Sequence, residues 1–237
     1  MLNCIYYGIA CYFFDVVFIC IWYYQGNLIV KLIIFDVCWT LYRSNTTFDF
    51  IKYVYKVEGI NSFKLDFLNS LIGRFLILLL GKLVGRDIYR ELFVDLLKGF
   101  SKESLEKSSE SFYNEFLIEK KIDYTFNLIN SMPLNSVILC SASLDIVVEH
   151  IAKMLNADLF ASKLKFKNWI YNGSINNELI EKKNKIFEYE NIDLVVTDNL
   201  SDLELVKKSS KSIILSTPKN IGFWERNGLT VDYILED

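Results

Sequence analysis

Short apolar runs alternate with amphipathic stretches along most of the chain. Residues 28–35 (LIVKLIIF), 135–140 (NSVILC) and 192–198 (IDLVVTD) are largely apolar on both faces, which is typical of buried strands. Stretches with helical spacing separate them, for example residues 144–155. The other elements predicted in this part are helices over 177–190 and 201–209 and strands over 211–217 and 232–236. This alternation predicts an α/β fold, a Rossmann-like parallel sheet core flanked by helices.

The alternation is interrupted between residues 45 and 132, where no strand pattern occurs. The spacing predicts an inserted all-helical unit of four or five helices. Breaks are predicted at Gly85 and near Gly99, with Ser101 as a helix N-cap. The core is then made of residues 28–44 and 133–237, on either side of the insert.

Two local features of the pattern lead to further predictions. The run 75–84 (FLILLLGKLV) is apolar enough to contact a membrane, but Arg74 interrupts it, and a place in the core of the helical bundle is favoured. Residues 158–166 are predicted to form a pair of strands. Asn172-Gly173 is predicted to form the hairpin turn that follows, because this dipeptide suits a two-residue turn.

Residues 1–26 form a separate apolar N-terminal segment, in which Asp15 is the only charged side chain. A membrane-spanning helix needs about 20 mostly apolar residues, so residues 1–24 are long enough for an anchor. An aspartate at mid-span would cost roughly 2.5–3.5 kcal/mol. Lys31 follows the segment and would leave the remainder in the cytoplasm. The alternatives are a helix docked on the domain, or a stretch ahead of the true start near Asn27.

The composition narrows the function. Apolar residues make up 52% of the chain, which supports a sizeable core. The formal net charge is −3 with both signs mixed, which argues against a nucleic-acid binder. The five cysteines include no CxxC pair, so a zinc site is disfavoured and a reducing, cytoplasmic location is the simpler interpretation. The single histidine, His150, lies in a helical pattern and is assigned a structural role.

Polar residues follow three of the predicted strands. Asp36 follows the first strand, Ser141 follows the second, and Asp198 ends the third, with Asp202 four residues later. In an open parallel sheet the working residues collect just past the carboxyl ends of the strands. These side chains are therefore expected to lie together.

This pattern resembles the haloacid dehalogenase superfamily of phosphohydrolases, in the branch similar to phosphoserine phosphatase that carries a helical cap, here residues 45–132. The resemblance covers residues 30–237. The matching segments are DVCWTLY (36–42) for the first motif, Asp-x-Asp-x-Thr-Leu, VILCSAS (137–143) for the second, EKKNKIF (181–187) for the third and TDNLSD (197–202) for the fourth. Lys183 fits the third-motif lysine better than Lys182 by its spacing to Ile186 and Phe187.

The resemblance implies a phosphomonoesterase that uses Mg²⁺ and acts on a small phosphorylated metabolite. Asp36 would be the nucleophile that forms an aspartyl-phosphate. Asp36, the backbone carbonyl of Cys38 and Asp198 would hold Mg²⁺, and Asp202 would orient the waters of the metal.

Two further residues would act on the phosphate. Ser141 would donate to a phosphoryl oxygen, and Lys183 would offset charge between the phosphate and the nucleophile. The structural alternatives are a helix N-cap for Ser141, a loop cap for Asp198 and a solvated surface position for Lys183. A second anionic group of the substrate has four candidate partners, which are Arg43, Arg74, Arg86 and Arg90.

Cys38 departs from the resemblance, because the phosphatases of the family place a second aspartate there as general acid and base. A thiol with a pKa of about 8.5 replaces it poorly in either role, which predicts slow turnover. The metal site would survive, because this position contributes a carbonyl. Trp39 is a second departure, since small or acidic residues are usual there, and its indole could narrow or cover the pocket.

Two other functions compete with the phosphatase. One is a catalytically impaired protein that binds phosphate and metal as a membrane-associated partner of another enzyme, which Cys38, Trp39 and the apolar residues 1–24 favour. The other is carbon–halogen or carbon–phosphorus chemistry, since relatives with those reactions also lack the second aspartate. They carry tyrosine or alanine there, which does not match. The sequence predicts no oligomeric state.

Overall fold

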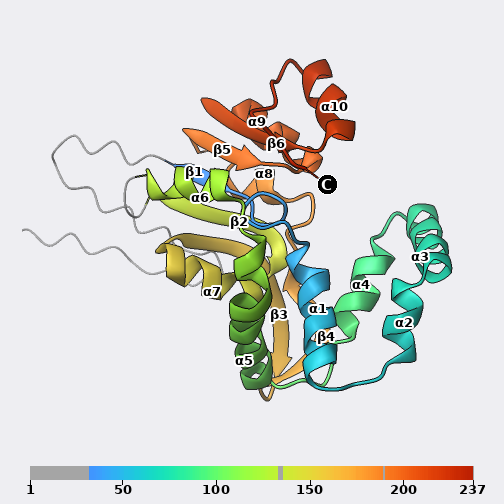
Figure 1. The fold of residues 1–237 in the computed structure, drawn as a ribbon. Coiled ribbons are helices and arrows are strands. Elements are labelled where there is room, and N and C mark those ends of the chain that lie inside the picture. The colour runs from blue at the N-terminus through green and yellow to red at the C-terminus, as the bar shows by residue number, and fades with distance from the viewer. Residues whose placement is uncertain (1–31, 133–135, 189, 237) are drawn as a thin grey trace, which may run out of the picture.

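The computed structural model describes residues 32–132, 136–188 and 190–236, which are drawn in colour in Figure 1. The apolar segment 1–24 and the first half of the predicted strand 28–35 lie outside these residues.

Within the described residues, seven strands form one sheet in the order β4-β3-β2-β1-β5-β6-β7. They are β1 (Ile33–Phe35), β2 (Val137–Leu144), β3 (Asp158–Lys167), β4 (Ile170–Asn177), β5 (Leu194–Thr197), β6 (Lys211–Ser216) and β7 (Tyr233–Ile234). Neighbouring strands run parallel, except β3 and β4, which are antiparallel. The predicted α/β fold with a mostly parallel sheet is therefore confirmed.

Between β1 and β2 the described residues form six α-helices, one or two more than the spacing predicts. These are α1 (Thr46–Val57), α2 (Phe63–Asn69), α3 (Leu71–Val84), α4 (Ile88–Asp95), α5 (Lys102–Phe112) and α6 (Asp123–Asn130). Gly85 ends α3 with a φ of 65°, and the Ser101 side chain accepts from Ser104 N at the start of α5. Both predicted breaks are confirmed. The four remaining α-helices are α7 (Asp145–Leu155), α8 (Lys183–Ile186), α9 (Leu203–Lys208) and α10 (Ile221–Arg226).

Helices cover both faces of the sheet (Figure 1). On β1, Ile33 and Phe35 point into one apolar cluster, which α1, α5 and α7 complete. Ile34 points the other way, into a second cluster with residues of α8, α9 and α10, including the fully buried Trp224. Because successive side chains of a strand face opposite sides, a central strand can be apolar throughout. The sheet is therefore fixed from both sides.

The hairpin after α7 differs from the prediction. Residues 158–166 belong to a single strand, β3, and the turn lies at Asn168 and Trp169, whose φ angles are 51° and 65°. Positive φ at both central residues is typical of a two-residue hairpin turn. Gly173 lies inside β4 instead, with a φ of 91°, close to the Asp95 and Lys98 side chains. The predicted turn at Asn172-Gly173 is therefore wrong by four residues.

The predicted helix over 177–190 is also shorter than expected, since only α8 forms there. Glu178 accepts hydrogen bonds from the backbone N–H groups of Leu179 and Ile180, at 3.0 and 3.2 Å. Glu181 then takes a φ of 54°. A left-handed residue interrupts a right-handed helix, so the helix can begin only after it.

The apolar stretch of the insert is not a bundle core. The chain turns at Ser70, so that α2 and α3 meet at 78°. Gly73 lies against Phe67 O, where an added Cβ would clash. Leu79, Leu80 and Leu83 of α3 are exposed, so the favoured burial of this run is wrong. No single helix in the described parts of the chain is long and apolar enough to cross a membrane, whereas α2 and α3 together meet that length and composition.

Candidate active site

The candidate site lies at the carboxyl edge of the sheet, at the end of β1. Phe35, the last residue of β1, pairs with Leu139 of β2 and Val196 of β5. Asp36 therefore lies where β1 ends between β2 and β5, and its backbone N–H donates to Val196 O at 2.9 Å. The side chain of Asp36 is almost completely buried. A carboxylate in such a place needs a partner.

Lys183 is that partner. Its Nζ lies 2.8 Å from Asp36 Oδ2 and 2.8 Å from Asp202 Oδ2. Thr197, at the end of β5, donates its hydroxyl to the same Asp202 oxygen at 2.8 Å. Lys183 is 4% exposed, whereas its neighbours Lys182 and Lys185 are exposed. The solvated surface position considered for Lys183 is therefore wrong, and the chain buries one lysine of three at this place.

The charges around Lys183 determine its protonation. Burial alone would lower the pKa of the Lys183 ammonium, but the carboxylates of Asp36 and Asp202 outweigh burial and raise the pKa. The ammonium is therefore charged at neutral pH. It holds together two carboxylates that would otherwise repel each other.

Replacing Lys183 with Met is expected to lower the free energy of unfolding by about 3–5 kcal/mol, because Asp36 and Asp202 would remain buried without their cation. The loss should shrink towards acidic pH, since the mutation removes the ammonium that lowers the pKa of buried Asp202, and protonation of Asp202 then removes part of the unpaired charge. Urea unfolding at pH 7.5 and pH 5 measures both effects. Lys185→Met, in the same helix but exposed, should stay within about 0.5 kcal/mol of the native chain. Equal stability of the two variants would contradict the ion-pair account.

Asp198 follows β5 and is held by Thr40. The Thr40 hydroxyl donates to Asp198 Oδ1 at 3.1 Å, and Asp198 N donates back to the Thr40 oxygen at 3.0 Å. Burial, and then the nearby carboxylate of Asp36, raise the pKa of Asp198 to about 8. Asp198 therefore does not act as a loop cap on the surface. It adds a third carboxyl group to the place that holds Asp36 and Lys183.

Cys38 lies among hydroxyl groups. Its Sγ is 3.2 Å from Thr46 Oγ1 and 3.1 Å from Ser143 Oγ, and these two oxygens are 2.6 Å apart. Burial, and then the Asp36 carboxylate, raise the pKa of the Cys38 thiol. The thiol is therefore protonated at neutral pH, which makes it a poor base and a poor nucleophile.

Ser141 lies in the same hydroxyl cluster. Its Oγ donates to Ser143 Oγ at 2.9 Å and accepts from Ser143 N at 3.2 Å. Ser141 is 1% exposed and does not cap α7, whose N-cap residue is Leu144. The N-cap alternative for Ser141 is therefore wrong.

The site geometry brings together residues from four separate parts of the chain. Direct contacts join Asp36, Lys183 and Asp202. Asp198 is joined to the first motif through Thr40, and Ser141 is joined to Cys38 through Ser143.

The chain was compared with known proteins by sequence and by structure. No family model matches the chain, and no curated protein matches it by sequence.

Solved structures do match. A Bordetella pertussis protein of unknown function superposes with a TM-score of 0.62 at 14% identity, covering 87% of this chain and 98% of that one. Apo phosphoserine phosphatase superposes with a TM-score of 0.52 at 22% identity, covering 87% and 94%. A Salmonella enterica hydrolase of the haloacid dehalogenase family gives a TM-score of 0.55 at 12% identity, covering 87% and 67%. The chain has the haloacid dehalogenase fold. At these identities the likeness establishes the fold, which confirms the expected architecture, and the chemistry must come from the site itself.

Within this haloacid dehalogenase fold, the oxygen donors at the sheet edge fit Mg²⁺. The ion prefers oxygen ligands and keeps several waters. Asp36 and Asp198 would supply carboxylates, and Cys38 would supply its backbone carbonyl. Burial, and then the Asp36 carboxylate, raise the pKa of Asp198, and a divalent cation bound beside them would favour the charged carboxylate. No group of three or more His, Cys, Asp or Glu side chains with metal-binding geometry occurs among the described residues, so carbonyl and water oxygens would have to complete the shell.

The structure gives the immediate surroundings of Asp202 and Trp39. The Oδ2 atom of Asp202 accepts hydrogen bonds from Lys183 and Thr197. Trp39 has a φ of 53°, and its backbone N–H donates to Tyr42 O at 2.8 Å. Its side chain is 41% exposed. A bulky residue in the left-handed region is uncommon and costs free energy.

Arg90 is not free to bind a substrate anion. Its guanidinium is buried, pairs with Glu178 at 3.3 Å, and donates to Thr47 Oγ1 at 3.2 Å and to the carbonyl of Ala142. Ala142 lies between Ser141 and Ser143, so Arg90 fixes the backbone that carries both hydroxyls. The other candidates are more exposed. Arg86 pairs with Glu91, while Arg74 lies over the Tyr89 ring.

Sequence reasoning missed the residues that hold the site together. Thr40, Thr46, Ser143 and Thr197 each contact a candidate site residue through a hydroxyl. Thr40 and Ser143 lie inside the matching motif segments, so the motif spacing was the available signal. Thr46 offered no signal, because only the folded chain brings α1 against Cys38.

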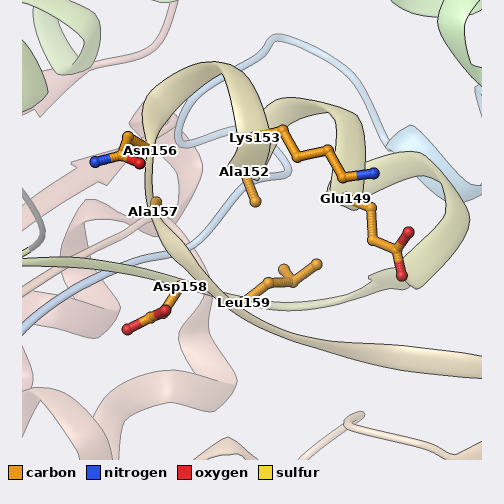
Figure 2. A pocket seen from close by; sticks show the side chains of 7 residues that line it. All are labelled: Glu149, Ala152, Lys153, Asn156, Ala157, Asp158 and Leu159. Atoms are coloured by element: carbon orange, nitrogen blue, oxygen red, sulfur yellow. The ribbon is translucent and has the colours of Figure 1, made fainter.

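A cavity of about 500 Å³ lies elsewhere in the molecule (Figure 2). It is lined by residues of α7 and the start of β3, namely Glu149, Ala152, Lys153, Asn156, Ala157, Asp158 and Leu159. Since β3 runs parallel to β2 and begins at Asp158, this cavity is at the amino edge of the sheet. None of the candidate site residues lines it.

Proposed function

We propose that this chain is a Mg²⁺-dependent phosphomonoesterase that hydrolyses a small phosphorylated metabolite through an aspartyl-phosphate on Asp36. The observation that carries the proposal is the buried Lys183 ammonium, 2.8 Å from Asp36, at the carboxyl edge of a haloacid dehalogenase fold. Structural neighbours named phosphoserine phosphatase and cytosolic 5′-nucleotidase IIIB support a small phosphorylated substrate. The helical insert, residues 45–132, would serve as the cap that selects the substrate.

The proposed reaction has two steps. A carboxylate oxygen of Asp36 attacks phosphorus, a new O–P bond forms, and the bond from phosphorus to the leaving oxygen breaks. Water then attacks the phosphorus of the aspartyl-phosphate, which releases inorganic phosphate and restores the Asp36 carboxylate. Bound Mg²⁺, held by Asp36, Asp198 and the Cys38 carbonyl, would neutralise phosphoryl charge.

The other side chains would hold the phosphoryl group and orient the nucleophile. Lys183 would place positive charge between Asp36 and the phosphoryl oxygens, and Asp202 with Thr197 fixes the position of its ammonium. Ser141 would turn its hydroxyl from Ser143 to a phosphoryl oxygen. Cys38 would leave both proton transfers largely to solvent, which makes the enzyme slow.

Hydrolysis of an aryl phosphate tests the proposal, because a good leaving group needs little proton donation. We expect release of the phenol with Mg²⁺ present and none after chelation by EDTA. Recovery on adding Mg²⁺ back serves as the control for damage by the chelator. Activity that is unchanged in EDTA would contradict the metal-dependent mechanism.

A second function is favoured by the protonated, half-buried thiol of Cys38, namely a catalytically impaired protein that binds phosphate and metal. Beryllium fluoride, which mimics an aspartyl-phosphate, separates the two. Mg²⁺-dependent binding of beryllium fluoride together with aryl phosphate turnover supports the enzyme. Binding without turnover supports the impaired protein.

A further inference from the structure

The helices α2 and α3 expose far more apolar surface than the rest of the insert. We call residues 63–84 the apolar tip. Its exposed apolar side chains are Phe63, Phe67, Leu71, Ile72, Phe75, Leu76, Leu78, Leu79, Leu80, Leu83 and Val84. Only Leu68 and Ile77, with Gly73 and Gly81, are buried in these two helices. A folded protein rarely leaves so large a continuous apolar patch in water unless another surface covers it.

The exposed residues of α3 are spread around most of the helix. At 3.6 residues per turn, Ile72, Phe75 and Leu79 lie on the side opposite to Ile77 and the two glycines, and other exposed apolar residues lie on the flanks between these two sides, namely Leu76, Leu78, Leu80 and Leu83. Figure 1 shows α2 and α3 at the outer end of the insert, away from the sheet, with only α4 between them and α1. A protein partner usually buries one apolar stripe along a helix. The hydrocarbon of a lipid bilayer can cover a wider apolar surface, such as the one that α3 exposes.

The charges of the apolar tip are mainly basic. Arg74 and Lys82 are the charged residues of α3, and Lys64 and Asp66 are those of α2. Basic side chains beside an apolar face suit the boundary between anionic headgroups and acyl chains. Lysine and arginine can extend their charged ends toward that boundary while their stems stay in apolar surroundings.

The length of the tip decides how it could contact lipid. Helix α3 has 14 residues, about 21 Å at 1.5 Å per residue, against about 30 Å of hydrocarbon in a bilayer. The 78° bend at Ser70 prevents α2 from extending it in line. The tip would therefore lie in the interface. The sequence holds a second apolar segment, residues 1–24, which has Asp15 as its only charge and lies outside the described residues.

We propose that the apolar tip inserts into the interfacial region of an anionic lipid bilayer, with α3 lying along the surface. Insertion covers the apolar side chains that the fold leaves in water, and Arg74 and Lys82 meet the lipid phosphates. This proposal does not depend on the proposed enzymatic function, since it rests on exposure, length and charge alone.

Hydrogen exchange measured by mass spectrometry on the full chain tests the proposal segment by segment. With vesicles of phosphatidylcholine and phosphatidylglycerol, we expect exchange over 63–84 to slow by roughly tenfold or more, and less with phosphatidylcholine alone. Exchange over β3 and β4 should not change. Vesicle binding without slower exchange over 63–84 would overturn the proposal, because residues 1–24 would then carry the binding.

A matched pair of variants completes the test. Ile72→Glu/Leu79→Glu/Leu83→Glu should weaken vesicle-dependent protection of the tip by roughly tenfold or more. Ile118→Glu/Met154→Glu/Ile234→Glu changes the net charge equally at exposed apolar positions elsewhere and should preserve the protection. Equal loss in both variants would overturn the proposal. Protection of 63–84 without vesicles that grows with protein concentration would also overturn it, since a second copy would then cover the tip.

Discussion

Replacing Asp36 with Asn is expected to reduce kcat/KM for an aryl phosphate by on the order of 10⁴-fold or more, because an amide cannot attack phosphorus. The substitution keeps the shape of the side chain, and its Oδ1 can still accept from Val37 N, at 2.7 Å in the native chain. Lys183 retains Asp202 as a partner. The variant should therefore fold, and loss of activity would report on the chemistry. Steady-state rates with Mg²⁺ measure the activity of the variant, and a thermal melt measures whether it is folded.

The matched control is Asp123→Asn, at the exposed first turn of α6. It removes the same charge without approaching Asp36, and we expect native rates. Native rates in Asp36→Asn as well would show that any hydrolysis has another source. The proposed nucleophile would then be wrong, whatever the fold.

Replacing Cys38 with Asp is expected to raise turnover of alkyl phosphates by about 10²–10⁴-fold, the usual contribution of a general acid and base. The structure offers a prepared position, since Thr46 and Ser143 lie 3.2 and 3.1 Å from the sulfur and could hydrogen-bond a carboxylate. The Asp36 carboxylate, which helps raise the pKa of the Cys38 thiol, would also raise the pKa of the new carboxyl group. That shift favours the protonated form that donates to a leaving alkoxide.

The gain should depend on the leaving group. Aryl phosphates leave with little proton donation, so their rates should rise much less than those of alkyl phosphates. Cys38→Asn, which has a similar shape and no ionisable group, should show no gain on either substrate. An equal gain on both substrates, or none, would contradict the idea that Cys38 is a missing acid.

The sheet and the placement of polar residues could be predicted from the sequence because burial on two faces imposes a simple rule. Strands that are apolar throughout must lie inside a sheet covered by helices, and parallel strands bring their carboxyl ends to one edge. Asp36 and Asp198 follow such strands, so their convergence required no knowledge of the turns. Lys183 could be selected over Lys182 only by its spacing to Ile186 and Phe187, and Phe187 is buried in the core.

The surroundings of α3 could not be predicted from the sequence. Nearly every residue of this helix is apolar, so the pattern does not indicate which side of the helix packs against the rest of the protein. The expected bundle core assumed that apolar means buried, and Leu79 and Leu83 are exposed. The hairpin was misplaced for a related reason. Asn-Gly is the stronger turn signal, but the strands pair so that Lys167 opposes Ile170, which forces Asn168 and Trp169 into the turn. In both cases tertiary packing overrode the local signal.

The buried guanidinium of Arg90 has a consequence for access. It joins α4 to α1 through Thr47, to β2 through Ala142 and to the segment after β4 through Glu178. A hinged swing of the insert away from the sheet would break the contacts of Arg90 with Ala142 and Glu178 together, while the contact with Thr47 would move with the insert. Entry to the sheet edge would then depend on a smaller local movement, and the sequence predicts that the half-exposed indole of Trp39, next to Cys38, would narrow that entry.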